Sequence, residues 1–328
     1  MNVLQKKSTD INSQNIFERD ILAGLSSSPK YLFSKYLYDT AGSRIFQDIM
    51  SMPEYYLTDC EFEILVAHKK RIESLFFENG NEIDLIELGA GDGAKTRILL
   101  EYFLSKNKQF KYIPVDISKN AVLELVEQLN HDFESLVVDG KIGDYFEEIH
   151  KLNKYDHHPK VLLFLGSNIG NYEPRQVQHF FEQLASVMGP QDRLFIGFDL
   201  KKDPFAIFNA YNDPHGHTKR FNLNLLNHIN RVMDADFDIS AFQHYESYDP
   251  QSGLAKSYLI SALEQKVTLK KLDRTINFAH WEPILVEISQ KYDVPMIKEM
   301  AAQNGFRIIE NFSDSRQYFI NSLWQPVQ

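Results

Sequence analysis

The stretch Asp84-Leu85-Ile86-Glu87-Leu88-Gly89-Ala90-Gly91-Asp92-Gly93-Ala94-Lys95-Thr96 decides the fold class of this chain. A short apolar run ends in an acidic residue, crosses three alternating glycines and passes into the helix-forming segment 96–104, which predicts a strand, a tight turn and a helix. Glycines allow positive φ angles and let a ligand approach the main chain closely. Because the turn follows the carboxyl end of a strand, where open α/β sheets bind ligands, it is predicted to bind a cofactor.

Two cofactors fit this turn. The spacing Gly89-x-Gly91-x-x-Ala94, with Asp116 about twenty residues later, matches the fingerprint of a dinucleotide such as NAD. The spacing Glu87-x-Gly89-x-Gly91-x-Gly93 resembles the first motif of class I S-adenosylmethionine (SAM) methyltransferases. Asp92 favours SAM, because a carboxylate in this loop would repel a pyrophosphate, whereas SAM carries no phosphate and has a positive sulfonium. The turn therefore favours SAM, with an NAD-dependent dehydrogenase as the alternative.

Composition limits the partners of this chain. Its 328 residues suffice for one large or two ordinary domains, and a net charge of −10 argues against a surface that binds nucleic acid. Cys60 is the only cysteine, so no intrachain disulfide or thiolate metal cluster is expected. His215 and His217 flank Gly216 but lack the further ligands of a zinc site, so we expect no metal. With no signal core and no membrane-spanning run, we expect a cytoplasmic monomer that acts on a small molecule.

After the glycine turn, strands and helices alternate, which predicts a parallel sheet with helices on both faces. The predicted strands cover residues 112–115, 136–138, 161–165 and 194–198, and the predicted helices cover 118–129 and 174–187. The segments 305–312 and 317–324 predict an antiparallel hairpin, the pair with which seven-stranded methyltransferase sheets finish. Dinucleotide dehydrogenases usually lack this pair, so the hairpin also favours SAM.

Polar residues follow several of these strands. Asp116 ends the second strand and is placed to accept hydrogen bonds from two ribose hydroxyls. Asp144 and Tyr145 follow the third strand, where a carboxylate beside an aromatic ring can contact an adenine. After the fourth strand, Asn168 and Asn171 either contact a substrate or cap the helix that starts near Pro174.

Two regions lie outside the alternation and predict a second domain. Before the first strand we expect a loop rich in tyrosine around Gly42 and Pro53, and then a helix over 58–72. Between Lys201 and about Gln290 the alternation stops, with a helix over 221–234 and a strand pair formed by 256–262 and 265–272. The expected domains are a SAM-binding domain of residues 61–200 and 291–328, and an α+β substrate-binding domain of residues 1–60 and 201–290.

Six stretches together resemble the histidine-specific SAM-dependent methyltransferases that make trimethylhistidine (hercynine) on the path to ergothioneine. They are YLYDTAGS (36–43), PEYY (53–56), ELGAG (87–91), LGSNIGN (165–171), NRVMDADF (230–237) and EIS (287–289), and the resemblance spans residues 30–325. It implies an α/β, Rossmann-like class I methyltransferase fold with a seven-stranded sheet. It also implies SAM as the cofactor and transfer of methyl groups to the α-amino group of L-histidine, with another amino acid or small amine as the alternative substrate.

The resemblance also implies site residues. Those that contact the cofactor are Tyr38, Gly89, Gly91, Lys95, Asp116, Asp144 and Tyr145, with Tyr38 and Lys95 at the methionine end. Those that hold the substrate's amino and carboxylate groups are Tyr56, Gly166, Asn171 and Tyr211, of which Tyr56 and Asn171 are the catalytic candidates. Glu287 and Ser289 match the pair that binds the imidazole ring. One position departs from the family pattern, because Ser257-Tyr258 stands where the family has Met before an aromatic residue, which leaves the amino-acid specificity open.

Overall fold

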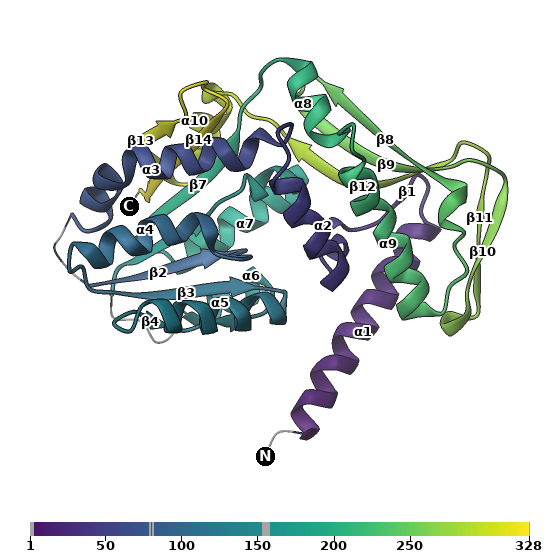
Figure 1. Cartoon of the computed structure of the whole chain (residues 1–328), viewed down its shortest axis with the longest axis horizontal. Coiled ribbons are helices and arrows are strands. Elements are labelled where there is room, and N and C mark those ends of the chain that lie inside the picture. The colour runs from purple at the N-terminus through teal and green to yellow at the C-terminus, as the bar shows by residue number, and fades with distance from the viewer. Residues whose placement is uncertain (1–2, 79, 81, 153–157, 328) are drawn as a thin grey trace. The chain divides into compact units, whose positions relative to one another are not determined.

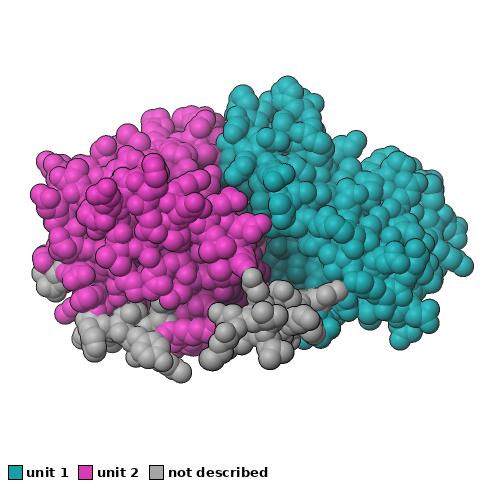
Figure 2. All heavy atoms as spheres, turned by 60° about the horizontal axis from the view of Figure 1, so that its bottom comes forward, with its two compact units in different colours: residues 1–55, 203–289 teal, residues 56–202, 290–328 magenta. Residues whose placement is uncertain are grey.

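The computed structural model of this protein describes residues 3–78, 80, 82–152 and 158–327 (Figure 1). The chain divides into two compact units, coloured in Figure 2: unit 1 comprises residues 1–55 and 203–289, and unit 2 comprises residues 56–202 and 290–328. The glycine turn belongs to unit 2. Among the described residues, no helix is both long and apolar enough to cross a membrane.

The centre of unit 2 is a mixed sheet with the strand order β13-β14-β7-β6-β2-β3-β4 (Figure 1). Neighbouring strands from β7 to β4 are parallel, and β14 runs antiparallel to both β7 and β13. The strands are β2 (Ile83–Leu88), β3 (Phe110–Asp116), β4 (Val137–Val138), β5 (Lys141–Ile142), β6 (Lys160–Phe164), β7 (Arg193–Asp199), β13 (Phe306–Ser313) and β14 (Phe319–Pro326). This order, with an antiparallel strand inserted beside β7, is that of the class I SAM methyltransferases, so the predicted fold class is confirmed.

Every residue of β2 and of β7 is buried, which indicates that both faces of this sheet are covered by helices. Along β7 the side chains alternate: Phe195 packs against Phe76 of α3, whereas Phe198 belongs to the core cluster that includes Phe181 of α7. The helices of unit 2 are α3 (Tyr56–Phe76), α4 (Ala94–Ser105), α5 (Lys119–Asp132), α6 (Tyr145–Leu152), α7 (Pro174–Val187), α10 (Val294–Gln303) and the short 3-10 helix η2 (Asn168–Asn171).

The C-terminal hairpin is present as predicted. Strands β13 and β14 pair antiparallel, and β14 also pairs with β7. Trp324 of β14 is fully buried, with its ring stacked on Phe181 at 5.4 Å and on Phe198 at 5.7 Å between ring centroids. The hairpin therefore completes both the hydrogen bonding and the core of the sheet. The strand predicted over 136–138 is shorter, and β4 and β5 each pair with β3 there.

Unit 1 combines a four-stranded sheet, order β1-β12-β9-β8, with the separate hairpin β10-β11. The short N-terminal strand β1 pairs parallel with β12, which lies more than 250 residues later in the sequence. The strands are β1 (Lys30–Tyr31), β8 (Phe242–Asp249), β9 (Leu254–Ser261), β10 (Gln265–Leu269), β11 (Arg274–Phe278) and β12 (Pro283–Gln290). The helices are α1 (Val3–Ser26), α2 (Thr40–Met50), α8 (Pro204–Tyr211), α9 (His217–Met233) and the 3-10 helices η1 (Ser34–Leu37), η3 (Ile239–Ala241) and η4 (Lys270–Leu272).

Two predictions for unit 1 are wrong. The segments 256–262 and 265–272 do not pair with each other, because β9 pairs with β8 while β10 pairs with β11. The segment around Gly42 is not a loop but helix α2, because the Asp39 side chain accepts the Gly42 N–H at 2.7 Å and so caps the helix. Asp39 also accepts from Asn224 of α9 at 2.8 Å, which ties α2 to α9.

Candidate functional site

The glycine turn connects β2 to α4 at the carboxyl edge of the sheet. Gly89, Gly91 and Gly93 have φ angles of 76°, 55° and 66°, which L side chains rarely adopt. A Cβ atom on Gly89 would lie 2.9 Å from the Tyr145 hydroxyl oxygen and 3.1 Å from Asn168 Nδ2. Residues that follow two other strands, β5 and β6, therefore lie close to the first glycine, and the cofactor role of Tyr145 stays a prediction.

Asp116 lies at the end of β3 beside the turn. Its carboxylate accepts the N–H of Gly91 at 3.1 Å and the N–H of Ser118 at 2.8 Å. A carboxylate has about four acceptor positions, so two hydrogen bonds from the main chain leave capacity for two hydroxyl donors. This geometry suits the predicted contact to a ribose, and it fixes the turn at the same time.

The acidic residue of the motif, Glu87, lies beneath the turn rather than on its surface. It is 3% exposed and accepts hydrogen bonds from the hydroxyls of Thr96, at 2.7 Å, and Tyr112. Burial raises the pKa of Glu87 to about 7, although the two hydroxyls act to lower it. Glu87 therefore joins β2, β3 and α4 and supports the glycine turn from below.

Lys95 lies in the first turn of α4 and pairs with a fully buried carboxylate. Its Nζ lies 2.7 Å from Glu61 Oε2, which also accepts the N–H of Gly166 at 2.9 Å. The other oxygen of Glu61 accepts from Asn321 of β14 at 2.8 Å. The structure thus joins Lys95, predicted to bind the cofactor, to Gly166, predicted to bind the substrate, through one carboxylate of α3.

The loop after β6 carries the two predicted amides. Asn168 and Asn171 begin and end η2, and a Cβ atom on Gly166 would lie 3.5 Å from both Lys95 Nζ and Asn168 Oδ1. The alternative that these amides cap α7 is wrong, because the N-cap residue is Glu173, whose N–H donates to the Gln176 side chain at 2.9 Å. Asp144 lies exposed just before α6. The predicted roles of Asp144 and Asn171 stay predictions.

Tyr56, the first residue of α3, belongs to a buried polar cluster. Its hydroxyl donates to the Asp199 carboxylate at 2.9 and 3.1 Å and lies 2.9 Å from Lys202 Nζ. Asp199 also forms ion pairs with Lys202 and, at 2.8 Å, with Lys291. Burial acts to raise the pKa of Asp199, but the ammonium groups of Lys291 and Lys202 outweigh it and hold that pKa below its usual range.

Unit 1 holds the predicted substrate residues of the insertion. The Tyr211 hydroxyl, at the end of α8, lies 2.9 Å from Ser289 Oγ on β12, and both side chains are buried. Glu287 precedes Ser289 by two residues on the same strand, so the two side chains share a face. The backbone oxygen of Tyr211 contacts His244 Nε2 at 3.0 Å, and burial lowers the pKa of His244. Three predicted residues of unit 1 therefore gather on α8 and β12.

Tyr38 and Ser257 are two further positions of unit 1 on which the sequence gives an expectation. Tyr38 packs edge-on against Phe46 and Phe221, with ring centroids 5.3 Å apart in each pair, and its cofactor role stays a prediction. Ser257, which stands where the family has Met, is buried, and its hydroxyl donates to Glu246 Oε2 at 2.6 Å. The Ser257 hydroxyl is therefore hydrogen-bonded to a side chain of the neighbouring strand β8.

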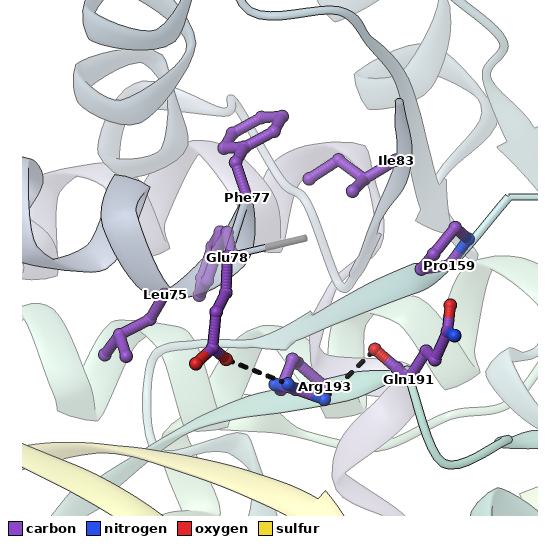
Figure 3. A pocket seen from close by; sticks show the side chains of 8 residues that line it. Leu75, Phe77, Glu78, Ile83, Pro159, Gln191 and Arg193 are labelled. Carbon is purple, nitrogen blue, oxygen red and sulfur yellow. Dashed lines mark hydrogen bonds and ion pairs between the residues drawn. The ribbon is translucent and has the colours of Figure 1, made fainter. Parts of the chain in front are cut away.

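A small cavity in the described part of unit 2 lies away from these residues. Figure 3 shows it among residues at the amino-terminal ends of β2, β6 and β7, with Arg193 reaching toward Glu78 and Gln191. Its volume is about 10 Å³, which is room for about one water molecule. This cavity is therefore too small for a cofactor.

The sequence did not predict four of the buried charged residues that contact predicted site residues or one another here: Glu61, Asp199, Lys202 and Lys291. For Glu61 a signal existed, because it lies on α3 among buried residues at helical spacing, namely Leu57, Cys60, Ile64 and Leu65. An acidic residue within such an apolar stripe must be paired. Asp199 and Lys202 pair locally, three positions apart, but the partners Lys95 of Glu61 and Lys291 of Asp199 lie far along the chain, so those pairings could not be read from the sequence.

Comparison with known proteins agrees with this geometry. The family model described as "Histidine-specific methyltransferase, SAM-dependent" matches residues 17–326. Histidine N-alpha-methyltransferases of Mycobacterium tuberculosis and Mycolicibacterium smegmatis are each 33% identical over 93% of this chain and 93% of the relative. N-methyltransferase fsqC of Aspergillus fumigatus is 26% identical over 88% of this chain and 78% of the relative.

Solved structures align more loosely. A SAM-dependent methyltransferase of Clostridium acetobutylicum is 11% identical with a TM-score of 0.42, over 79% of this chain and 91% of that chain. This similarity is too low to carry an argument, so the fold assignment rests on the strand order.

The residues around the glycine turn fit SAM. The positive φ angles open the main chain to a ligand, Asp116 retains acceptor capacity, and Asp92 disfavours a pyrophosphate. The family match excludes the dehydrogenase alternative for this chain, which is a SAM-dependent methyltransferase. From the strand order, the glycine turn and a match over residues 17–326, the chain belongs to the histidine-specific SAM-dependent methyltransferase family.

Proposed function

We propose that this protein transfers methyl groups from SAM to the α-amino group of L-histidine, up to trimethylhistidine. The observation that carries the proposal is 33% identity over 93% of the chain to two proteins named histidine N-alpha-methyltransferase. We further propose that unit 2 is the SAM-binding domain and unit 1 the substrate-binding domain. The expected boundaries of 61–200 with 291–328 and of 1–60 with 201–290 differ slightly from the units, since Tyr56 begins α3 in unit 2.

On this proposal the cofactor is held by unit 2 residues whose positions suit it. Asp116 accepts the ribose hydroxyls, Tyr145 and Asp144 contact the adenine, and Lys95 meets the methionine end. Glu61 fixes Lys95 through the 2.7 Å ion pair, so the ammonium group is held in one place. Tyr38 contributes to the methionine end as the resemblance implies.

The substrate residues divide by the group they hold. Tyr56, Gly166, Asn171 and Tyr211 bind the amino and carboxylate groups, and Glu287 with Ser289 binds the imidazole ring. The contact between Tyr211 and Ser289 supports this assignment, because it joins one residue from each set. The carboxylate of Glu287, which is half-buried, would accept a ring N–H, and the hydroxyl of Ser289 can serve the other ring nitrogen.

The chemical demand on the protein is small. SAM supplies an activated methyl group, and an amine is already a nucleophile once it has lost its proton. The chain must bind the amine without its proton, direct the lone pair at the methyl group and exclude water, which is catalysis by proximity and orientation. Tyr56 is the proposed route by which the proton leaves.

A second candidate function is N-methylation of another amino acid or small amine. Two observations favour keeping it: fsqC, a relative at 26% identity, is named only as an N-methyltransferase, and Ser257 stands where the family has Met. The Ser257 hydroxyl is engaged by Glu246, so its smaller volume rather than its polarity would alter the pocket.

The proposal is tested with Glu287→Ala. The variant should raise KM for histidine by roughly ten- to a hundredfold while SAM affinity stays unchanged, because the lost hydrogen bond binds ground and transition states alike. Glu264→Ala, an exposed carboxylate of the same unit, is the matched control and should keep the parent KM. If Glu287→Ala methylates histidine as well as the parent does, the histidine assignment is wrong.

A further inference from the structure

The polar cluster around Tyr56 brings one carboxylate and two lysines together in the protein interior. Asp199 pairs with Lys202 and Lys291, and all three side chains are buried, with exposed fractions of 0%, 4% and 0%. Burial penalises the charged form of a lysine and so favours the loss of its proton. The buried position of Lys202 therefore favours an uncharged amine.

Lys202 is the lysine that lies against the Tyr56 hydroxyl. Its Nζ is 2.9 Å from that oxygen and 4.2 Å from the centroid of the Tyr56 ring. Lys291 contacts the other side of the carboxylate, 2.8 Å from Asp199 Oδ2. Burial lowers the pKa of Lys202, although Asp199 acts to raise it. The geometry and the electrostatics thus select the same lysine.

The elements around Lys202 bring few other charged or titratable groups. Tyr56 and Cys60 come from α3, Asp199 from the end of β7, Lys291 from the segment after β12, and Tyr318 from the turn before β14, with its ring centroid 5.2 Å from Nζ. Burial raises the pKa of Cys60 to about 12, so its thiol stays neutral. Two charged groups of the turn before β14, Asp314 and Arg316, act on Cys60, and Asp199 is the carboxylate with which Lys202 forms an ion pair.

We propose that Lys202, as the free amine, is the terminal acceptor of the proton that the substrate amine must lose, and that Tyr56 relays this proton. This proposal rests on the proposed function, in which Tyr56 meets the substrate amine. Lys202 acts through Tyr56 and is a positioning and proton-accepting residue. Asp199 holds Tyr56 and Lys202 together and stabilises the ammonium that forms.

The proton transfer balances without any further reactant. The substrate ammonium loses one N–H bond, and its proton forms an O–H bond with Tyr56. The Tyr56 O–H, which donates to Asp199 in the resting cluster, turns toward Lys202 Nζ. As the new O–H bond forms, this original O–H bond breaks, and its proton bonds to the lone pair of Lys202 Nζ. The substrate is left as a neutral amine, Tyr56 is unchanged and Lys202 is an ammonium. After the product leaves, the same route returns the proton to water.

The test is the pH profile of kcat/KM for Lys202→Met and Lys202→Arg. Lys202→Met removes the acceptor but leaves Lys291 paired with Asp199, and Lys202→Arg keeps a donor to Asp199 but is always protonated and so cannot accept a proton. Both should lose on the order of a hundredfold or more near pH 7. In Lys202→Met the loss should disappear as pH rises to where the substrate amine is already neutral in water.

The control is Lys201→Met, which changes the neighbouring lysine, paired with Asp293 at 3.3 Å, and should keep the parent profile. Tyr56→Phe interrupts the relay while leaving the pairs of Asp199 with both lysines, so it should show the same recovery at high pH. If Lys202→Met does not fold, the activity of Lys202→Arg near pH 7 decides the matter.

Two results would overturn the proposal: a Lys202→Arg variant as active as the parent, or pH profiles of Lys202→Met and Tyr56→Phe parallel to that of the parent. The profiles are measured on whichever amino acid the parent methylates. A preference for an amino acid other than histidine therefore contradicts the proposed function, while the slopes still decide for or against the relay.

Discussion

Among single residues, Glu87 has an environment that makes the stability of the protein depend on pH. Its pKa of about 7 in the folded chain exceeds the ordinary value of 4.5, so folding favours the protonated carboxyl. This contribution is fully present below pH 4.5 and is lost as pH rises through about 7, at most at about 1.4 kcal/mol per pH unit. We expect Glu87→Gln, measured by urea unfolding at a series of pH values, to remove this slope.

The difference between parent and variant isolates Glu87 from other titrating groups. Equal slopes for the parent and Glu87→Gln between pH 4.5 and 7 would mean that Glu87 does not titrate in this range.

We expect the affinity for SAM to depend directly on the carboxylate of Asp116. Asp116→Ala removes a carboxylate that is proposed to accept two ribose hydroxyls, and hydrogen bonds to charged groups contribute roughly 1.5–3 kcal/mol each. We expect SAM affinity, measured by calorimetry, to fall at least tenfold. Asp139→Ala is the matched control, because Asp139 pairs with Lys111 and Lys141 instead and should not affect SAM binding. Equal affinity in Asp116→Ala and the parent would remove Asp116 from the site.

The residues of the glycine turn could be predicted from sequence because each acts through local geometry. Gly89, Gly91 and Gly93 show their φ requirement in their spacing, and Asp116, at the end of a buried strand, could be placed beside the turn. No sequence pattern indicated Lys202. Its proposed role as a proton acceptor depends on Asp199 and Tyr56. Because Tyr56 lies 146 positions away in the chain, only the folded structure brings its hydroxyl to the amine.

Among the elements, α3 links the helical layer to the sheet through one buried side chain. Glu61→Ala would leave Lys95 without its carboxylate and leave the Gly166 N–H and the Asn321 amide without an acceptor. We expect the free energy of unfolding to fall by about 3 kcal/mol, the usual cost of breaking a buried pair, and SAM affinity to fall with it.

The control for this element is Asp59→Ala, an exposed acidic residue of α3, which should change stability by no more than about 0.5 kcal/mol. A Glu61→Ala variant as stable as Asp59→Ala would show that the Lys95 pair contributes nothing to the fold.

The sequence predicted the positions of fully buried strands well, but it predicted the pairing partners of the strands in unit 1 poorly. The apolar runs of β2, β6 and β7 allow one interpretation, because buried parallel strands are apolar on both faces. The segments that became β9 and β10 each had the pattern of a strand, but a strand pattern does not name its partner. Their partners, β8 and β11, had not been predicted, so the two were wrongly paired with each other.

For the whole molecule, sequence identified the fold class because the glycine turn and the C-terminal hairpin are independent signs of one topology. The hairpin was the more decisive sign of the fold class, because β14 lies antiparallel beside β7, which distinguishes this sheet from a dinucleotide-binding one. The N-terminal contribution to unit 1 was harder to foresee. Strand β1 has only two residues, and its partner β12 is at the far end of the insertion.

The central claim is that the molecule methylates the amino group of histidine, and one measurement tests it directly. The purified protein is incubated with SAM and an equimolar mixture of the amino acids, and the products are analysed by mass spectrometry. The account predicts that histidine alone is consumed and that the final product carries three added methyl groups on its α-nitrogen. Methylation of a different amino acid, with histidine left unchanged, would contradict it.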